Sequence, residues 1–466
     1  MMRLEVPAVG GVMNESRRRF MERCARIMGA TSMSGMIGRM SPAAAQDQPP
    51  VNWAGNYRYS TQHVTSLSSV SEVQDFVRKH EHFKVLGTRH CFNGIADSTD
   101  HFLSLREMKE IALDRAARKV TIGSGLSYGQ LSPYLDRQGF ALHNLASLPH
   151  ISVAGACATA THGSGPKNGN LSTSVSGLEV VSAQGDLLTF ARDKDPNAFQ
   201  AAVVHLGAIG VVTRVTLDLQ PTFTMRQDVY LDLPMAQARE HLDEIVSAGY
   251  SVSLFTDWQK GRINEVWVKR RIETEGATLT ASKDFYGARP ATTNVHPIVE
   301  LSAENCTEQM GVPGPWYERL PHFRMGFTPS SGKELQSEYF VPRRNAVEAI
   351  AAVERLRDQV SPHLMISELR TIDADELWMS PCHKRPSLAI HFTWKQDWEA
   401  VRKVLPMIER ELAPFDVRPH WGKLFTIPSA QLQQRYENCA EFKRFVAQCD
   451  PHGKFRNAFL NATLFG

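Results

Sequence analysis

A short apolar strand that runs into a turn ending in one histidine constrains this chain more than any other feature of its sequence. This stretch, residues 84–94, reads Lys-Val-Leu-Gly-Thr-Arg-His-Cys-Phe-Asn-Gly, and residues 147–165 form a second run rich in Gly, Ser, Thr and His. Small residues let backbone N–H groups approach a diphosphate closely, and hydroxyls donate to phosphate oxygens. Together the two segments predict a cradle for a dinucleotide cofactor, with His90 facing its ring end. Each segment alone is equally typical of an ordinary glycine turn after a strand.

The order and spacing of three blocks resemble the vanillyl-alcohol oxidase family of FAD enzymes, most closely its alditol (xylitol) oxidases. The blocks are the strand-turn-His of residues 84–94, Ser-Leu-Pro-His-Ile-Ser at 147–152 and His-Trp-Gly-Lys at 420–423. The likeness extends over nearly all of residues 52–466. It implies an α+β fold in which a two-subdomain FAD-binding domain holds an extended FAD. A substrate domain, an antiparallel sheet flanked by helices, would roof the flavin ring.

Composition excludes several other classes of protein. A chain of 466 residues is too long for a single core, and its net charge of +3 shows no basic run beyond the N-terminus, which argues against a nucleic-acid partner. No stretch approaches eighteen uninterrupted apolar residues, so we expect no membrane span. The seven cysteines form no C-x-x-C pair, which argues against a metal site. Whether any of the six cysteines after residue 45 pair is left open.

Residues 1–45 resemble a twin-arginine export signal. Residues 16–21 read Ser-Arg-Arg-Arg-Phe-Met, and Ser-Pro-Ala-Ala-Ala at 41–45 offers an A-x-A-like cleavage site before Gln46. The resemblance implies a periplasmic or secreted protein, exported already folded around its cofactor. Two alternatives remain: a basic disordered tail on a cytoplasmic protein, or a misassigned start with Met13 as the true one.

Three further ranges organise the chain. Residues 52–220 alternate short helices and strands: the capping-box spacing at 69–72 predicts a helix, residues 178–190 a hairpin, and residues 206–213 a closing strand. No G-x-G-x-x-G lies between a strand and a helix, which argues against a nicotinamide cofactor. Longer strands and helices mark residues 221–419 as the substrate domain. By resemblance, residues 420–466 return to the FAD-binding domain.

The resemblance implies that His90 is bonded through a ring nitrogen to the 8-methyl group of the flavin, although a lone histidine could equally be a satisfied turn residue. Arg89 stands where the family usually has Gly, so the turn either differs or directs this guanidinium to solvent or phosphate. Ser147 takes the place of a second flavin-linking Cys found in some relatives, so we expect a single attachment. The cofactor contacts expected are Val85, Leu86, Gly87, Thr88, Arg89, His90, Cys91, Ser147, Ser152, Gly155, Ala156, Cys157, Ala158, His162, Gly210 and Val211.

Alcohol oxidation needs a hydride acceptor and donors that hold the hydroxyl oxygen as its proton leaves. Period-two spacing on strand-like segments turns both side chains of Glu368-Leu-Arg370 to one face, and does the same for His391-Phe-Thr393. Taken singly, these pairs are equally typical of exposed charges that alternate with core residues. Taken with Lys423, they match the substrate pocket of alditol oxidases.

By resemblance and chemistry, Arg370 and Lys423 hold the reacting hydroxyl, and His391 is the proton acceptor or a further donor. Glu368, Thr393 and Ser147, together with Arg370 and Lys423, would bind the substrate. His150 and His162 are expected to contact the flavin or to be structural.

The predicted function is FAD-dependent oxidation of a terminal primary alcohol of a linear polyol, such as xylitol or sorbitol, to the aldose with formation of hydrogen peroxide. The alternatives are an aldonolactone oxidase or dehydrogenase of the same family, or a non-catalytic flavin- or sugar-binding exported protein. We expect a monomer with a polyol and oxygen as partners. The preferred polyol and the electron acceptor are left open.

Overall fold

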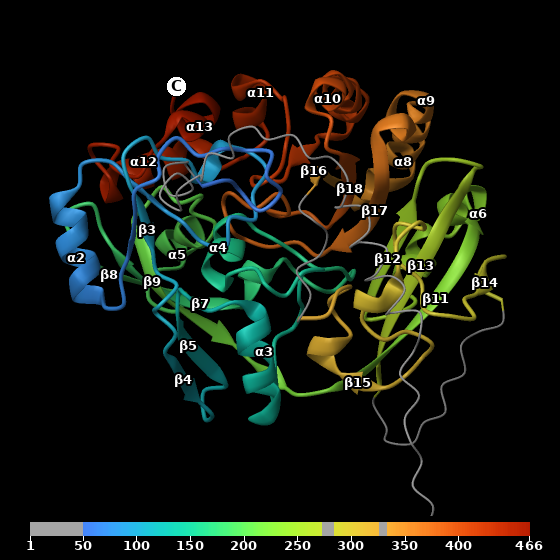
Figure 1. The fold of residues 1–466 in the computed structure, drawn as a ribbon, viewed down its shortest axis with the longest axis horizontal. Helices are drawn as coiled ribbons and strands as arrows, with labels where there is room; N and C mark the ends of the chain where they lie inside the picture. The colour runs from blue at the N-terminus through green and yellow to red at the C-terminus, as the bar shows by residue number, and fades with distance from the viewer. Residues whose placement is uncertain (1–49, 273–283, 326–332) are drawn as a thin grey trace, which may run out of the picture. The chain divides into compact units, whose positions relative to one another are not determined.

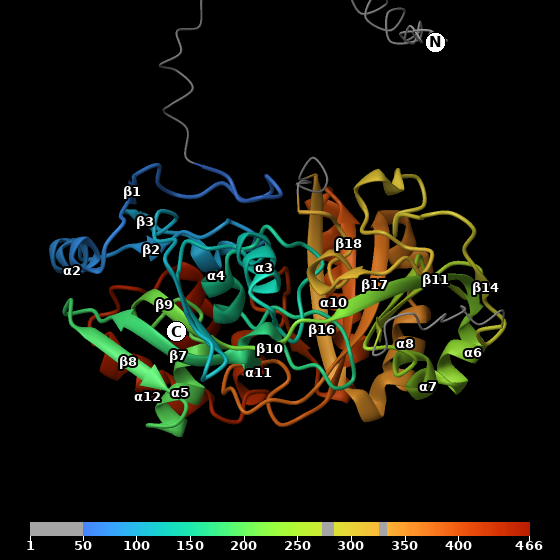
Figure 2. The same cartoon turned by 90° about the horizontal axis from the view of Figure 1, so that it is seen from below.

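Two sheets of different size build the first part of the chain in this computed structural model, which describes residues 50–272, 284–325 and 333–466. The predicted export signal lies outside these ranges. A small parallel sheet has the order β1–β3–β2, and a five-stranded antiparallel sheet has the order β4–β5–β9–β7–β8 (Figures 1 and 2). The strands and helices here are β1 (Val64–Ser66), α2 (Val70–Lys79), β2 (Lys84–Val85), β3 (Phe102–Ser104), β4 (Ile111–Asp114), β5 (Lys119–Gly123), α3 (Tyr128–Arg137), β6 (Phe140–Ala141), α4 (Val153–Ala158), β7 (Val175–Val181), β8 (Leu187–Ala191), α5 (Pro196–Val203) and β9 (Val211–Asp218).

Local sequence accounts for where these elements begin. The Ser69 hydroxyl accepts from the Glu72 N–H, and the Glu72 carboxylate accepts from the Ser69 N–H, so the predicted capping box starts α2. Ser127 and Gln130 start α3 in the same way. The predicted hairpin is confirmed as the antiparallel pair β7 and β8.

The strand expected over residues 206–213 is shorter than predicted, because it begins only at Val211. Leu206, Gly207 and Gly210 have φ angles of +56°, +70° and +142°. These values lie outside the extended region that a strand requires. The glycines therefore form a loop before β9.

A nine-stranded antiparallel sheet fills the middle of the chain, with the order β14–β11–β13–β12–β17–β18–β16–β19 and β15 paired to β11. Its strands are β11 (Thr224–Pro234), β12 (Ser251–Thr256), β13 (Arg262–Ile272), β14 (Arg289–Pro290), β15 (Gly314–Pro315), β16 (Glu334–Pro342), β17 (Leu364–Ile372), β18 (Ser387–Lys395) and β19 (Arg418–Pro419). Its helices are α6 (Met235–Glu240), α7 (Leu242–Val246), α8 (Ala346–Glu354), α9 (Arg357–Val360) and α10 (Trp398–Leu412).

Alternation along the strands divides the sheet into two faces. Leu369 on β17 and Ile390 on β18 belong to the main core together with Ile350 of α8 and Val404 of α10. Figures 1 and 2 show these two helices beside strands β16–β18. The intervening residues of the same strands therefore point away from the helices.

The C-terminal segment connects the large sheet to the turn after β2. Residues 420–424 run beside β16, because the His420 N–H donates to the Glu338 carbonyl and the Leu424 N–H to the Gln336 carbonyl. Asn93 then donates from Nδ2 to the carbonyls of Trp421 and Lys423. Helices α11 (Ser429–Gln434), α12 (Cys439–Cys449) and α13 (Ala458–Leu460) complete the chain.

The predicted fold class is confirmed: the molecule combines helices with antiparallel sheets in an α+β arrangement. All six cysteines in the described ranges are free. Across the same residues, no helix is both long enough and apolar enough to cross a membrane.

Candidate active site

A cavity of about 500 Å³ lies between the N-terminal segments and strands β16–β18. This volume is within the usual range for pockets that bind small molecules, roughly 300–1,000 Å³. The predicted cofactor residues that line it are Val85, Leu86, Gly87, Thr88, Arg89, His90, Cys91, Ser147, Ser152, Gly155, Ala156, Ala158 and His162. The predicted substrate and catalytic residues Glu368, Arg370, His391, Thr393 and Lys423 line the same cavity. Residues from distant parts of the sequence thus meet at one site.

Three residues that we expected to contact the cofactor do not line the cavity: Cys157, Gly210 and Val211. Cys157 is buried on the core side of α4, with its sulfur 3.6 Å from the Tyr128 hydroxyl. Val211 is fully buried in a core cluster beside α2. At Gly210, an added Cβ would lie 2.5 Å from the Val181 carbonyl oxygen. Packing therefore explains all three residues without a cofactor.

Arg89 adopts the left-handed conformation in the turn that carries the histidine, with φ = +62°. This conformation is normally favoured by glycine, so the geometry of the turn is kept although its usual residue is replaced. The Trp53 N–H donates to the Arg89 carbonyl at 2.8 Å, which holds the turn. The exposed guanidinium of Arg89 donates to the Val51 carbonyl. The turn therefore keeps its geometry, and the alternative of a different turn is wrong.

The two cradle segments are joined at Ser152. Its N–H donates to the Thr88 hydroxyl, and its Oγ lies where a Cβ on Gly87 or Gly155 would approach to 2.9 or 2.7 Å. A side chain at Gly87 would crowd Ser152 of the other segment, and one at Gly155 would crowd the same hydroxyl from within its own segment. Gly87 therefore lets the two segments pack closely at Ser152, and the predicted approach of backbone N–H groups to a diphosphate stays a prediction.

Four cavity residues form one row across four neighbouring strands. Phe255 of β12 pairs with Glu368 of β17, which pairs with His391 of β18, which pairs with Glu338 of β16. Arg370 and Thr393 lie two residues further along their strands and so face the same side. The predicted period-two spacing thus brings Glu368, Arg370, His391 and Thr393 together.

Glu338 lies at the centre of the cationic side of the cavity and was not predicted. Its carboxylate, 1% exposed, accepts from Arg370 Nη2 at 2.8 Å and from Lys423 Nζ at 2.7 Å. His162 Nε2 also lies 3.1 Å from it. Burial alone raises the pKa of Glu338, but the charges around it hold that pKa well below its usual range. The residue is therefore an ionised bridge between the two cations.

Lys423 connects this bridge to His391. Nζ of Lys423 lies 2.8 Å from His391 Nδ1, and His391 Nε2 lies 3.0 Å from the Thr393 hydroxyl. Burial, followed by the charge of Lys423, lowers the pKa of His391 to about 4. Burial also lowers the pKa of Lys423, and the Glu338 carboxylate opposes that shift. His391 is accordingly neutral at pH 7 and accepts a hydrogen bond at Nδ1.

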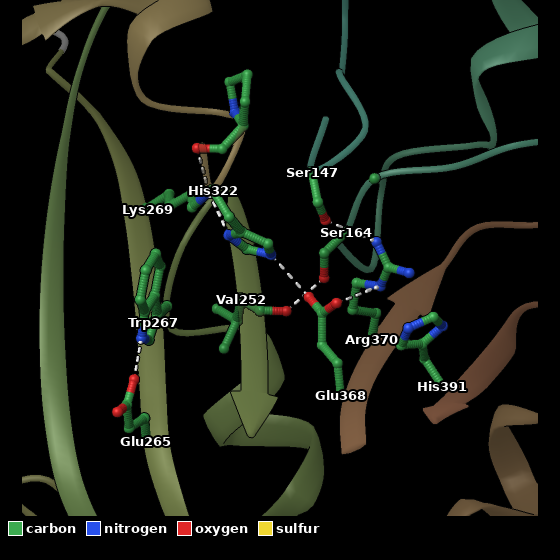
Figure 3. A network of polar contacts seen from close by, with 12 residues as sticks. Ser147, Ser164, Val252, Glu265, Trp267, Lys269, His322, Glu368, Arg370 and His391 are labelled. Atoms are coloured by element: carbon green, nitrogen blue, oxygen red, sulfur yellow. Dashed lines mark hydrogen bonds and ion pairs between the residues drawn. The ribbon is translucent and has the colours of Figure 1, made fainter. Parts of the chain in front are cut away.

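Glu368 is fixed from the other side of the cavity by His322, which also was not predicted. Nε2 of His322 lies 2.8 Å from Glu368 Oε1, and Arg370 Nε lies 3.5 Å from Glu368 Oε2. Arg370 Nη1 reaches the Ser147 hydroxyl at 3.4 Å. Figure 3 shows this network running between the two sides of the site. Glu368, the carboxylate that the sequence predicted at this site, is therefore held between a ring nitrogen and a guanidinium.

Two family models match separate parts of the chain. The model described as FAD binding domain matches residues 61–191, which include the His90 turn and the glycine run. The model described as D-arabinono-1,4-lactone oxidase matches residues 328–463, which include Glu338, Arg370 and Lys423. The matches thus fall on the two sides of the cavity.

Alditol oxidase of a Streptomyces species (strain IKD472) is 46% identical to the chain over 419 residues, which is 89% of this chain and 99% of that protein. This chain belongs to the alditol oxidase group of the vanillyl-alcohol oxidase family. L-gulonolactone oxidase of Mus musculus is 24% identical over 89% of the chain and 98% of its own length. L-gulono-1,4-lactone dehydrogenase of Mycobacterium tuberculosis is 26% identical with the same coverage.

A solved structure supports the fold assignment within this family. Cholesterol oxidase from B. sterolicum superimposes with a TM-score of 0.72 at 15% identity, over 93% of this chain and all of that one. At this identity the likeness concerns the fold alone. The sequence relatives confirm the predicted FAD-dependent oxidoreductase of the vanillyl-alcohol oxidase family.

The residues of this family member fit an FAD at the cradle. The Nδ1 atom of the partly buried His90 is shielded from solvent, and it has no hydrogen-bond partner among the described residues. Its ring lies 4.6 Å from the Trp53 ring and 5.4 Å from the His150 ring, measured between centroids. Burial, followed by His150 and Lys423, lowers its pKa well below the usual range. A neutral imidazole beside the cavity thus has a lone pair available to a cofactor.

Sequence analysis missed two residues of the site, Glu338 and His322, and the sequence marks them to different degrees. Glu334, Gln336 and Glu338 alternate on β16 and all line the cavity, so period-two spacing would have found Glu338. His322 follows a proline in an irregular segment, where no periodicity marks a face.

Proposed function

We propose that this protein oxidises a terminal primary alcohol of a linear polyol, such as xylitol or sorbitol, to the aldose and passes the electrons to oxygen to give hydrogen peroxide. The observation that carries the proposal is the pair of cations, Arg370 and Lys423, that one buried carboxylate holds at the cavity wall. The alditol oxidase relative, 46% identical, has the matching substrate class in its name.

Side chains of the cavity can hold the reacting hydroxyl and accept its proton. FAD, when bound, supplies the hydride acceptor. Arg370 and Lys423 donate to the hydroxyl oxygen and stabilise negative charge on it in a water-poor site. The proton leaves through Lys423 and His391: the ammonium first passes a hydrogen to His391 Nδ1, 2.8 Å away, and the neutral amine so formed then takes up the hydroxyl proton, which restores the ammonium and leaves His391 charged. Neutral His391 is the group that takes the charge.

The remaining polar groups would select for a polyol. Glu368 presents an ionised carboxylate to the cavity, and Thr393 and Ser147 present hydroxyls. A substrate without further hydroxyls would leave these buried groups unpaired, which costs affinity. A simple alcohol is therefore a poor substrate.

We also propose a covalent bond between a ring nitrogen of His90 and the flavin. Its neutral ring and the partnerless Nδ1 support the bond. Ser147 cannot supply the thiol for a second link, so one attachment is expected.

An aldonolactone oxidase or dehydrogenase is the second candidate, because the matching model for residues 328–463 is that of D-arabinono-1,4-lactone oxidase. The lower identity of the lactone-named relatives, 24–26%, favours the polyol.

Anaerobic mixing with xylitol, sorbitol and L-gulono-1,4-lactone tests both candidates. Xylitol or sorbitol should bleach the flavin absorbance at 450 nm, and admission of air should restore it with one equivalent of peroxide. Lys423→Met should lower the bleaching rate about 10²–10⁴-fold while the flavin stays bound. Bleaching by the lactone alone would reject the polyol, and bleaching without peroxide would reject oxygen as the acceptor.

We further propose export by the twin-arginine route and a monomeric flavoprotein. N-terminal sequencing of the protein from the culture medium or periplasm should then begin at Gln46, and light scattering should give the mass of one chain. Intact protein confined to the cytoplasm would reject export.

A further inference from the structure

We infer that Lys269 and His322 act as one positioning unit that holds Glu368 as an ionised hydrogen-bond acceptor and thereby gives the cavity its selectivity for hydroxyl-bearing substrates. Neither residue is among those expected at the site from the sequence. Selectivity for hydroxyls presupposes the proposed polyol oxidation, so the inference rests on that function.

Lys269 is a buried lysine in the last third of its strand; burial lowers its pKa to about 7, and the charge of Glu368 opposes that shift. It lies on β13, two strands away from Glu368, and its side chain is 1% exposed. Its Nζ donates to the carbonyls of Leu320 at 2.5 Å and Pro321 at 3.2 Å, and contacts His322 Nδ1 at 3.1 Å. Three acceptors match the three hydrogens of an ammonium group. The lysine is thus fully engaged and points at one nitrogen of one ring.

The His322 ring is fixed on its faces and at both nitrogens. Trp267 and Phe255 pack edge to face against it, with ring centroids 5.1 and 5.4 Å away. Its backbone N–H donates to the Ser147 carbonyl, which ties the ring to the cradle segment. Figure 3 shows the ring lying between Lys269 and Glu368. The imidazole therefore has no second orientation that keeps both contacts.

The contact with Lys269 decides which nitrogen of His322 carries a proton. An ammonium can only donate, so a neutral ring must present its lone pair at Nδ1 and its hydrogen at Nε2. If the shared proton moves from Nζ to Nδ1, the ring becomes charged, but Nε2 still keeps its hydrogen. As long as the pair holds this proton, it carries one positive charge in both placements and donates to Glu368 Oε1.

Several charged or titratable groups face Glu368 from the elements packed around it. They are Arg370 of β17, His391 of β18, His322, Lys269 of β13 and Lys423. Burial alone raises the pKa of Glu368, but Arg370 and His322 hold that pKa far below its usual range. Without Lys269, the proton of His322 can settle on Nδ1. The bare Nε2 would then oppose a carboxylate lone pair, and Glu368 would bind a proton at a higher pH.

The test compares two replacements of the same ring. In His322→Gln, the amide oxygen can accept from Lys269 while the amide nitrogen donates to Glu368. His322→Leu has a similar volume but neither function. With xylitol, we expect the KM of the leucine variant to rise about ten- to one-hundredfold with a smaller change in kcat, and the glutamine variant to recover at least tenfold of that loss. Equal KM values for the two variants would overturn the inference.

Lys269→Met gives a second, pH-based readout. Because Glu368 would then titrate at a higher pH, an acid limb should enter the kcat/KM profile between about pH 4.5 and 6, where the wild type is flat with respect to this group. Bound flavin at 450 nm checks that the variant folds. A profile that coincides with the wild type would count against the positioning unit.

A substrate-independent measurement separates this inference from the proposed function. In the holoprotein labelled with ¹⁵N-histidine, the His322 signals are assigned by their loss in His322→Gln. We expect a proton on Nε2 in the wild type and its loss or shift in Lys269→Met. A bare Nε2 in the wild type would overturn the positioning role even if xylitol is oxidised. A failure to oxidise polyols with the expected proton on Nε2 would reject only the substrate.

Discussion

Glu338 holds two cations at once, so its charge reaches both groups that the proposed reaction would place at the hydroxyl. In a buried site, removing one partner of an ion pair costs more than the pair itself contributes, because the other charge remains desolvated. The consequences of changing Glu338 should therefore appear in Lys423 and Arg370 rather than in the carboxylate alone.

Replacement of Glu338 by Gln should lower kcat/KM about tenfold to a hundredfold at pH 7. Without the carboxylate, burial lowers the pKa of Lys423 further, so the ammonium is lost at a lower pH than in the wild type. The alkaline limb of the kcat/KM profile should shift to lower pH. Glu409→Gln is the matched control, because Glu409 is a buried carboxylate that bonds Tyr339 and Thr426 outside the cavity. A shift of the same size in the control would contradict the role of Glu338.

Replacement of His90 by Ala should release the flavin from covalent attachment. Acid precipitation of the wild type should leave yellow fluorescence in the pellet, whereas the flavin of the variant should stay in the supernatant. A fluorescent pellet from the variant, or a colourless one from the wild type, would show that His90 is not the attachment site.

At the level of elements, the register of β16, β17 and β18 places the reactive groups. Each strand contributes alternate residues to the cavity, and the intervening residues pack against α8 and α10. One residue of slip would exchange the two sets. The hydrophobic contacts of the helices therefore also determine which polar side chains face the substrate.

Gly210 gives a prediction at the start of β9. An added Cβ would lie 2.5 Å from the Val181 carbonyl oxygen, and its φ of +142° disfavours any other residue. Gly210→Ala should therefore lower the free energy of unfolding by about 2 kcal/mol or more, measured by chemical denaturation. Gly177→Ala in the neighbouring strand β7 is the control, because its Cβ would meet nothing nearer than 3.5 Å. Equal stability of the two variants would refute the packing role.

The sequence predicted those parts of the site that follow local rules. Glu368 and Arg370 could be paired from their spacing, because a strand repeats every two residues. Lys269 could not, because its run Lys-Arg-Arg has the composition of an exposed strand end, and only the carbonyls of Leu320 and Pro321 make it a buried site. The loop at 206–210 was misread as a strand because apolar residues alone do not reveal positive φ angles. Local composition reveals neither that a distant segment of the chain buries a residue nor that a backbone φ angle is positive.

Across the whole molecule, many histidines are buried in neutral form. Burial lowers the pKa of His205 to about 3 and those of His322 and His391 to about 4. Burial also lowers the pKa values of the fully buried His162 and His420 and of the partly buried His90 and His143. Acidification therefore favours the unfolded chain, in which these rings bind protons near pH 6.5.

Because the unfolded chain binds more protons at these histidines than the folded protein does, the thermal stability of the purified flavoprotein should depend on pH. The contribution of these histidines to stability is fully present above about pH 6.5 and is lost as the pH falls towards 4, by about 2 kcal/mol at pH 5 for each of His322 and His391. Glu265 and Asp375, whose burial raises their pKa to about 7, act in the opposite direction but are fewer. We expect Tm to fall by about 5 °C or more between pH 7 and pH 5, and His205→Gln to reduce the slope. A Tm that rises on acidification would contradict the prediction that the histidines outweigh the buried carboxylates.

The hydrogen bonds from Asn93 to the carbonyls of Trp421 and Lys423 have a consequence for synthesis. The histidine turn leaves the ribosome more than three hundred residues before the lysine that it must face. A growing chain can therefore fold its glycine-rich cradle early and yet possess no reactive centre. The cavity receives Lys423 only when the late segment docks onto the early one, so an incomplete chain lacks one wall of the site.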